Sequence, residues 1–256
     1  MVNATKKTNR TRIISLLALI SAFCLQTLSL VSQEEVFTLC YHNIFRISGE
    51  PGPCYISAGR LEEQLKYFRD EGYRSVLPED IFKHINGTEP LDKKCILFSF
   101  DDTHESHYTI SAPLLEKYGF RGTFFIMTVV IGKKHYMTGA QIKSLADRGH
   151  CIANHTYDHQ DLRKLPAGQW KKQIEDSNNK LEKITGTNIC FFAYPFGACN
   201  RYAAENLQKR GMELSFQLSG KQIPGFRLQS QRRLMVSGTW SSGRLNKEML
   251  RTFRKQ

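Results

Sequence analysis

The stretch CILFSFDD at residues 95–102 decides the fold prediction, because a mostly apolar run ends on two adjacent carboxylates. A strand that is apolar on both faces is typical of a parallel sheet covered by helices on its outer side. Other runs of strand length share this character. The predicted strands are Val36–Tyr41, Cys95–Phe100, Thr123–Met127, Cys151–Asn154, Ile189–Tyr194, Leu214–Leu218 and Leu234–Val236.

Amphipathic stretches with apolar residues at helical spacing separate these strands, and a glycine follows each of them. The glycines are Gly72, Gly119, Gly149, Gly186 and Gly211. Glycine directly after a helix is typical of a left-handed C-terminal cap. The repeated order of strand, helix, glycine and strand predicts an α/β fold, a distorted (β/α) barrel of about seven strands.

The N-terminal segment differs from the rest of the chain. Its basic residues Lys6, Lys7, Arg10 and Arg12 precede the uncharged stretch Ile13–Val31. This layout predicts a secretory signal peptide over residues 1–32, with a retained membrane anchor as the alternative. Residues 33–256 are long enough for one domain with its own core, and no linker or repeat divides them. We therefore expect an exported protein: periplasmic, extracellular or attached to the envelope.

Composition narrows the classes of partner. The formal net charge is +12, which could favour anionic envelope polymers or headgroups, although the well-solvated surface of an exported protein is the preferred explanation. No tract of Lys and Arg alternates with aromatic residues, so we expect no nucleic-acid partner. The seven cysteines include no C-x-x-C pair, which argues against a cysteine zinc site. Cys40 lies inside an apolar run and is expected to be a free buried thiol.

Three chemically useful clusters follow predicted strands at their carboxyl ends: Asp101 with Asp102, His155 with His159, and Pro195–Gly197. The carboxyl end of a parallel α/β barrel carries the active site, so we expect these clusters to meet. Two imidazoles and one carboxylate bind zinc and leave a coordination position open for water or substrate. Adjacent strand residues point in opposite directions, so the two aspartates are expected to act differently, one as ligand and one as proton acceptor.

The motifs SFDD (99–102), HTYDH (155–159) and FAYPFG (192–197) resemble the first three motifs of the polysaccharide deacetylases. These are the NodB-homology enzymes of carbohydrate esterase family four, and the resemblance spans roughly residues 38–240. It implies release of acetate from an N-acetylated or O-acetylated sugar polymer. It also implies Asp101 as the general base, with Asp102, His155 and His159 holding Zn²⁺ or a similar divalent ion.

Further roles follow from the same resemblance. The backbone N–H of Phe196 would stabilise the tetrahedral oxyanion, and Tyr194 is expected to line the groove. No histidine follows His159 in the chain, so the general acid is expected to be His42, in LCYHNI at 39–44. An N-terminal histidine of this kind resembles the exported poly-N-acetylglucosamine deacetylases.

The sequence departs from the family pattern at two places. Thr103 stands where the first motif usually has glycine, and the third motif lacks its usual arginine. Arg232 or Arg233 could supply that charge from the last predicted strand. His104 and His107 follow the aspartates closely, but the set of three metal ligands is complete without them.

Other interpretations stay open at this point. The Asp pair could cap a turn, and His42 could be a structural histidine at a strand end. A glycosidase with two carboxylates would leave the histidine pair unexplained. A catalytically impaired, deacetylase-like scaffold that binds glycan is the main alternative to an enzyme. The sequence does not choose the polysaccharide or the metal.

Overall fold

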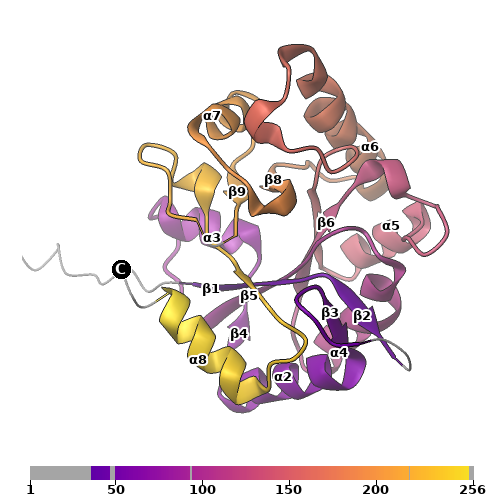
Figure 1. The fold of residues 1–256 in the computed structure, drawn as a ribbon, viewed down its shortest axis with the longest axis vertical. Helices are drawn as coiled ribbons and strands as arrows, with labels where there is room; N and C mark the ends of the chain where they lie inside the picture. The colour runs from indigo at the N-terminus through magenta and orange to yellow at the C-terminus, as the bar shows by residue number, and fades with distance from the viewer. Residues whose placement is uncertain (1–35, 47–49, 93, 219, 254–256) are drawn as a thin grey trace, which may run out of the picture. The chain divides into compact units, whose positions relative to one another are not determined.

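A parallel sheet curls around the centre of the computed structural model, which describes residues 36–46, 50–92, 94–218 and 220–253 (Figure 1). Its strand order is β10-β1-β5-β6-β7-β8-β9. The short strand β4 pairs with the first two residues of β5. The strands are β1 (Phe37–Tyr41), β4 (Arg74–Ser75), β5 (Cys95–Phe100), β6 (Gly122–Ile126), β7 (Cys151–Asn154), β8 (Phe191–Ala193), β9 (Leu214–Phe216) and β10 (Leu234–Met235). A separate small sheet pairs β2 (Asn43–Phe45) with β3 (Tyr55–Ser57).

The two edges of the sheet are joined by the segment that leads into β10. Gln231 forms a parallel bridge with Phe216 of β9. Its N–H donates to the carbonyl of Ser215 at 2.9 Å, and its carbonyl accepts from the N–H of Gln217 at 2.8 Å. Directly afterwards, β10 pairs with β1. The expected distorted barrel of about seven strands is therefore confirmed.

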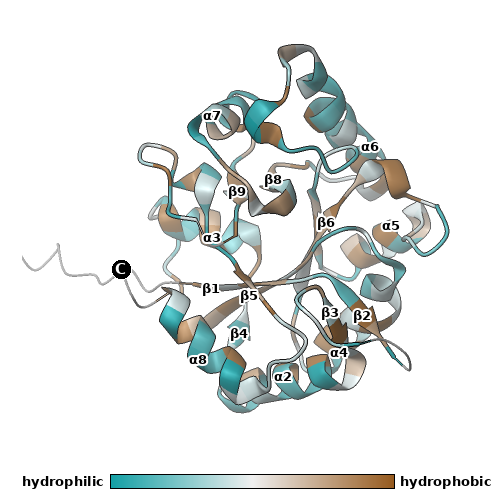
Figure 2. Ribbon diagram, viewed as in Figure 1, coloured by the Kyte–Doolittle hydropathy of each residue, from teal (hydrophilic) through white to brown (hydrophobic). Residues whose placement is uncertain are grey.

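Helices cover the outer side of the curled sheet, and Figure 2 shows hydrophobic strands at the centre with hydrophilic outer helix faces. Ser57, Thr138 and Asn200 each cap a helix by accepting from the N–H three residues ahead. The helices are α2 (Ala58–Asp70), α3 (Pro78–Ile85), α4 (Ala112–Lys117), α5 (Gly139–Asp147), α6 (Asp176–Thr185), α7 (Arg201–Lys209) and α8 (Ser242–Phe253).

The alternation of side chains along β5 divides the core into two layers. Phe98 and Phe100 belong to the cluster beneath the helices. Leu97 belongs to the cluster inside the barrel, with Phe125 and Phe216. By the same alternation, Asp101 emerges on the interior side at the carboxyl end of the strand. The fold thus places this carboxylate over the mouth of the barrel.

The predicted elements agree with the structure in type. The strands β5 and β7 have the predicted bounds, and the five glycines expected after helices all have positive φ. The short strands β2, β3 and β4 and the helices α3 and α8 were not predicted. No helix among the described residues is long and apolar enough to cross a membrane. The division into residues 1–32 and 33–256 stays a prediction, since the first segment lies outside the described residues.

Candidate metal centre and active site

Asp102, His155 and His159 converge on one point at the carboxyl ends of β5 and β7. Their ligand atoms all lie within 4.8 Å of one another. The Nε2 atoms of both histidines lie 3.5 Å from Asp102 Oδ1, and that oxygen is buried without a hydrogen-bond partner among the described residues. This distance is too long for a good hydrogen bond but suits groups arranged around a cation.

The orientation of the His155 ring also suits a metal ligand. Its Nδ1 lies 2.8 Å from the carbonyl oxygen of Ala193, which can only accept, so Nδ1 carries the hydrogen. The lone pair of Nε2 is thereby presented toward Asp102. A backbone carbonyl that fixes the tautomer in this way is a usual companion of a metal-ligating histidine. The three residues therefore fit a divalent cation such as Zn²⁺.

Backbone strain is concentrated around this point. Five of the seven non-glycine residues with positive φ among the described residues belong to the site loops: Asp102, Thr103, Thr156, His159 and Phe196. The left-handed region costs an L-residue roughly 1–2 kcal/mol. Such conformations persist where the surroundings hold them, and they are frequent at functional sites.

Thr103 shows how the chain accommodates its departure from the family pattern. Its φ of +65° explains why glycine is the usual residue there. The side chain is fully buried, and its Oγ1 accepts from the N–H of Met127 at 2.7 Å. Its carbonyl accepts from the N–H of Met137 at 3.0 Å. The threonine thus ties the Asp102 turn to the end of β6 and does not open it.

The loop that carries the histidines is held by polar side chains beside it. Asn154 Oδ1 accepts from the N–H of Thr156 at 2.6 Å. Gln173 accepts from the N–H of Tyr157 at 3.1 Å and donates to Asp158 at 2.7 Å. Asn154 thus fixes the loop backbone, and Asp158 holds the side chain of Gln173. Gln173 was missed, because it lies outside the motifs.

Asp101 is held by Arg233 and does not face the histidines as a ligand. The guanidinium donates to both carboxylate oxygens at 2.7 Å and to Ser99 Oγ at 3.0 Å. Both partners are buried. Arg232 instead donates to the carbonyl of Thr252 at 2.8 Å. Of the two arginines left open by the sequence, Arg233 is the one at the aspartate.

The charges of the site keep both aspartates ionised. Burial alone would raise the pKa of Asp101, but the charge and hydrogen bonds of Arg233 outweigh it and hold the pKa far below its usual range. Burial also opposes the charge of Asp102, yet contact with His155 leaves the Asp102 pKa lowered. The two neighbouring carboxylates thus remain charged because each has a different neighbour that favours the charge, Arg233 for Asp101 and His155 for Asp102.

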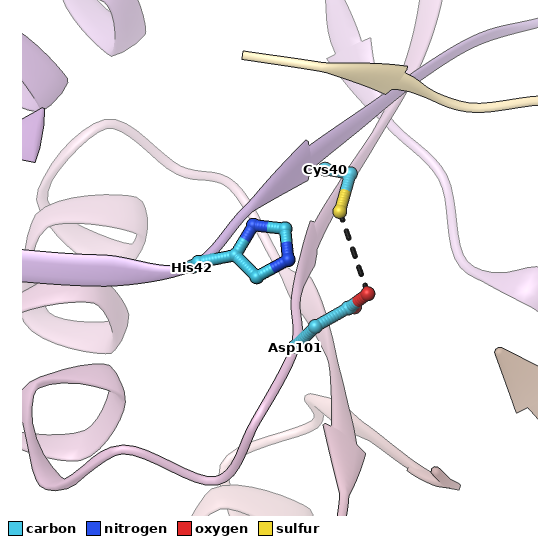
Figure 3. Close-up of side chains that lie close together, drawn as sticks. All are labelled: Cys40, His42 and Asp101. Atoms are coloured by element: carbon cyan, nitrogen blue, oxygen red, sulfur yellow. Dashed lines mark hydrogen bonds between the residues drawn. The ribbon is translucent and has the colours of Figure 1, made fainter. Parts of the chain in front are cut away.

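His42 faces Asp101 from the end of β1 (Figure 3). Cys40 and His42 lie two residues apart and point to the same side, and the Cys40 thiol donates to Asp101 Oδ2 at 3.4 Å. The ligand atoms of Cys40, His42 and Asp101 lie within 4.8 Å of one another. Cys40 is a free buried thiol, as expected. The expected acid and base are therefore brought together by the pairing of β1 with β5.

His107 supports this arrangement from behind. It is fully buried, and its Nε2 donates to the carbonyl oxygen of His42 at 2.7 Å. Burial lowers the pKa of His107 to about 4, so the ring is neutral. Its Nδ1 is buried without a partner among the described residues, which costs about 1–3 kcal/mol. Neither His107 nor His104, which hydrogen-bonds Ser106 at 2.8 Å, belongs to the metal cluster.

The third motif borders the site through Phe196. This residue is 66% exposed, and its ring lies 4.4 Å from the ring of His159, centroid to centroid. Tyr194 is fully buried, and its hydroxyl donates to the carbonyl of Gln229 at 2.8 Å. The expectation that Tyr194 lines the groove is therefore wrong. A Cβ on Gly197 would lie 2.3 Å from Leu218, so this turn requires glycine.

A barrel of parallel strands with a two-histidine, one-carboxylate cluster at its carboxyl end belongs to the class of α/β folds that carry catalytic sites on that face. Comparison with known proteins identifies the family within this class. The sequence profile of the family described as "Polysaccharide deacetylase" matches residues 88–215, half of the 256 residues. The chain belongs to the polysaccharide deacetylase family.

Individual relatives agree with this assignment. YxkH of Bacillus subtilis is 28% identical over 176 residues, which cover 69% of this chain and 62% of that protein. The poly-beta-1,6-N-acetyl-D-glucosamine N-deacetylase of Staphylococcus aureus (strain MRSA252) is 26% identical over 183 residues, covering 66% of this chain and 62% of that protein. The chain therefore spans less than two thirds of either relative.

A solved structure confirms the fold. The Streptococcus pyogenes deacetylase PplD, in complex with acetate, matches with a TM-score of 0.77 at 24% identity. The match covers 84% of this chain and 98% of that chain. The fold is thus that of a NodB-type deacetylase domain.

Metal titration tests the cluster of Asp102, His155 and His159. The metal-free protein should bind one equivalent of Zn²⁺ tightly, measured by calorimetry. Asp102→Asn should weaken this affinity by about 100-fold or more, since loss of an outer partner alone costs about 10–100-fold. His104→Asn is the matched control and should bind normally. Equal affinity in the wild type and Asp102→Asn would rule out this ligand set.

Proposed function

We propose that this protein is an exported, metal-dependent deacetylase that removes N-acetyl groups from a polysaccharide of the poly-N-acetylglucosamine type. The observation that supports the proposal is that an ionised aspartate lies beside a group of three metal-binding side chains. Asp101 is fixed by Arg233 at 2.7 Å, directly beside the cluster of Asp102, His155 and His159. When bound, a divalent cation supplies Lewis acidity to the acetyl carbonyl and makes a water molecule more acidic.

Asp101 is suited to accept the proton of the attacking water. Its carboxylate has about four lone-pair positions, of which Arg233 occupies two and the Cys40 thiol a third. The low pKa keeps it ionised over the physiological range. Its Oδ2 lies 4.0 Å from His155 Nε2, so the base lies next to the ligand cluster.

His42 is suited to protonate the departing amine. It lies beside Asp101, directly after the last residue of β1 (Figure 3). The backbone around it is fixed, because the N–H of Asp101 donates to the carbonyl of Tyr41 at 3.0 Å and His107 donates to the carbonyl of His42. Base and acid on different strands can act on the two sides of one acetamide.

The third motif would complete the site. The backbone N–H of Phe196 is our candidate donor to the tetrahedral oxyanion, and one such donor contributes roughly 3 kcal/mol. The exposed ring of Phe196 offers an apolar surface to a sugar ring. The relative from Staphylococcus aureus, named as a poly-N-acetylglucosamine deacetylase, supports the choice of polymer. The predicted signal segment supports export to the envelope.

Acetate release tests the activity. The zinc-loaded protein should release acetate from N-acetylglucosamine oligomers, measured by an enzymatic acetate assay. Asp101→Asn should lose about 10²–10⁴-fold in kcat, because it removes the general base. Absence of release from the wild type with zinc bound, over several acetylated glycans, would favour a glycan-binding scaffold.

The role of His42 can be separated from metal binding. His42→Asn should lower kcat by about 10²–10⁴-fold through loss of the general acid, with zinc stoichiometry unchanged. His104→Asn, on the neighbouring loop, should stay near the wild-type rate. Wild-type activity in His42→Asn would assign the acid to another group.

His107 is expected to act only by positioning His42. His107→Phe removes the donor to the His42 carbonyl and should lower kcat by up to about 10²-fold, since a displacement of about 1 Å can cost that much. His107→Gln retains an N–H donor and should recover much of the rate. In a His42→Asn background, His107→Phe should cause no further loss. An equal loss in both backgrounds would indicate a general structural role.

A further inference from the structure

We propose that Cys40, His42 and Asp101 form a second site for a thiophilic divalent cation, and that its occupation inhibits the deacetylase. The inhibitory effect rests on the proposed function, because His42 and Asp101 are the acid and base assigned there. The binding itself rests only on geometry and donor chemistry. The three ligand atoms lie within 4.8 Å of one another, the same limit that the Asp102 cluster meets.

The geometry of the site comes from two paired strands. Cys40 pairs with Ser99 across the ladder of β1 and β5, so the residues two further along each strand, His42 and Asp101, are also neighbours. All three side chains point to the interior of the barrel, since Tyr41 and Phe100 stack together on the opposite face. Ligands of a tetrahedral zinc lie about 3.5 Å apart, given bonds of about 2.0–2.3 Å. The ligand atoms would therefore approach one another by up to about 1.3 Å when a metal binds.

The donor set selects the metal. A thiol, an imidazole and a carboxylate supply sulfur, nitrogen and oxygen, which suit Zn²⁺, Co²⁺ or Cd²⁺ and not Mg²⁺ or Ca²⁺. His42 Nδ1 is buried without a hydrogen-bond partner among the described residues. The Cys40 thiol already points at Asp101 Oδ2, at 3.4 Å (Figure 3). Binding would transfer the thiol proton to solvent and replace it with a metal–thiolate bond.

Arg233 sets the order in which the two sites fill. Its guanidinium donates to both oxygens of Asp101 and already neutralises that carboxylate. A cation beside Asp101 therefore meets a positive charge, whereas Asp102 forms no ion pair with an arginine or lysine in the described part of the chain. The Cys40 site must be the weaker one and must fill second. Metal at low concentration activates, and metal in excess inhibits.

Occupation of this site would remove both proton-transfer groups at once. His42 would lose the lone pair that holds the transferred proton, and Asp101 would share its charge with the cation. Loss of general acid–base catalysis costs about 10²-fold or more. The neighbouring cluster would keep its own metal, so the inhibited protein would hold two equivalents.

Cobalt spectroscopy tests the site without any need for activity. The metal-free, full-length protein is titrated with Co²⁺ under reducing conditions, and the near-ultraviolet thiolate-to-cobalt absorption is followed. The first equivalent should give no thiolate band, and the second should give one. Cys40→Ser keeps a hydroxyl donor toward Asp101 but is a poor metal ligand, so it should lose the band. Cys40→Ala serves as a second variant and should also lose the band. Cys54→Ser is the control, because Cys54 is not one of the three ligands, and it should retain the band.

A parallel assay follows acetate release against Zn²⁺ concentration. The wild type should show activation followed by inhibition of about 10²-fold, whereas Cys40→Ser should show activation alone. A missing thiolate band, or a band that persists in both Cys40 variants, overturns the second site. A Cys40-dependent band without inhibition overturns the inhibitory role and counts against His42 and Asp101 as acid and base. A protein that never releases acetate but shows the band retains the metal site and loses the proposed function.

Discussion

The buried pair of Asp101 and Arg233 is the interaction on which the rest of the site depends. Both side chains are almost completely inside the protein, where a lone charge would be very unfavourable. Arg233 precedes β10, the strand that pairs with β1 after Gln231 has bridged to β9. The segment that closes the barrel is therefore the segment that carries Arg233, the partner of the Asp101 base. A barrel that failed to close would leave a buried carboxylate without its partner.

The regular sheet supports the strained backbone of the site loops. Thr103, Thr156 and Phe196 hold left-handed conformations, while the strands beneath them belong to one sheet packed between apolar clusters. Side-chain hydrogen bonds from Thr103 and Asn154 offset part of the cost locally. The rigid sheet can therefore support turns that aim the metal-binding side chains inward.

The sequence predicted the parts of the molecule whose signal is local. Strands such as β5 lie in long apolar runs and stand out, whereas β2, β3 and β4 are short and lie in no longer apolar run that would mark them. The aspartate pair and the histidine pair were predicted to meet because both follow strands, and the choice of Asp102 as the ligand followed from the family resemblance. The choice between Arg232 and Arg233 could not be made, because it depends on how the barrel closes. Tyr194 was misplaced, because the sequence does not show that its hydroxyl reaches Gln229.

The two adjacent aspartates show how one backbone feature divides their chemistry. On a regular strand, Asp102 would point away from Asp101 and toward the helices. The strand instead ends at Phe100, and Asp102 adopts a φ of +79°, which turns its carboxylate toward His155 and His159. Asp101 keeps the interior direction of the strand and meets Arg233. One carboxylate is thus neutralised by the protein and the other is left for a cation, so a single left-handed residue separates the proposed base from the proposed metal ligand.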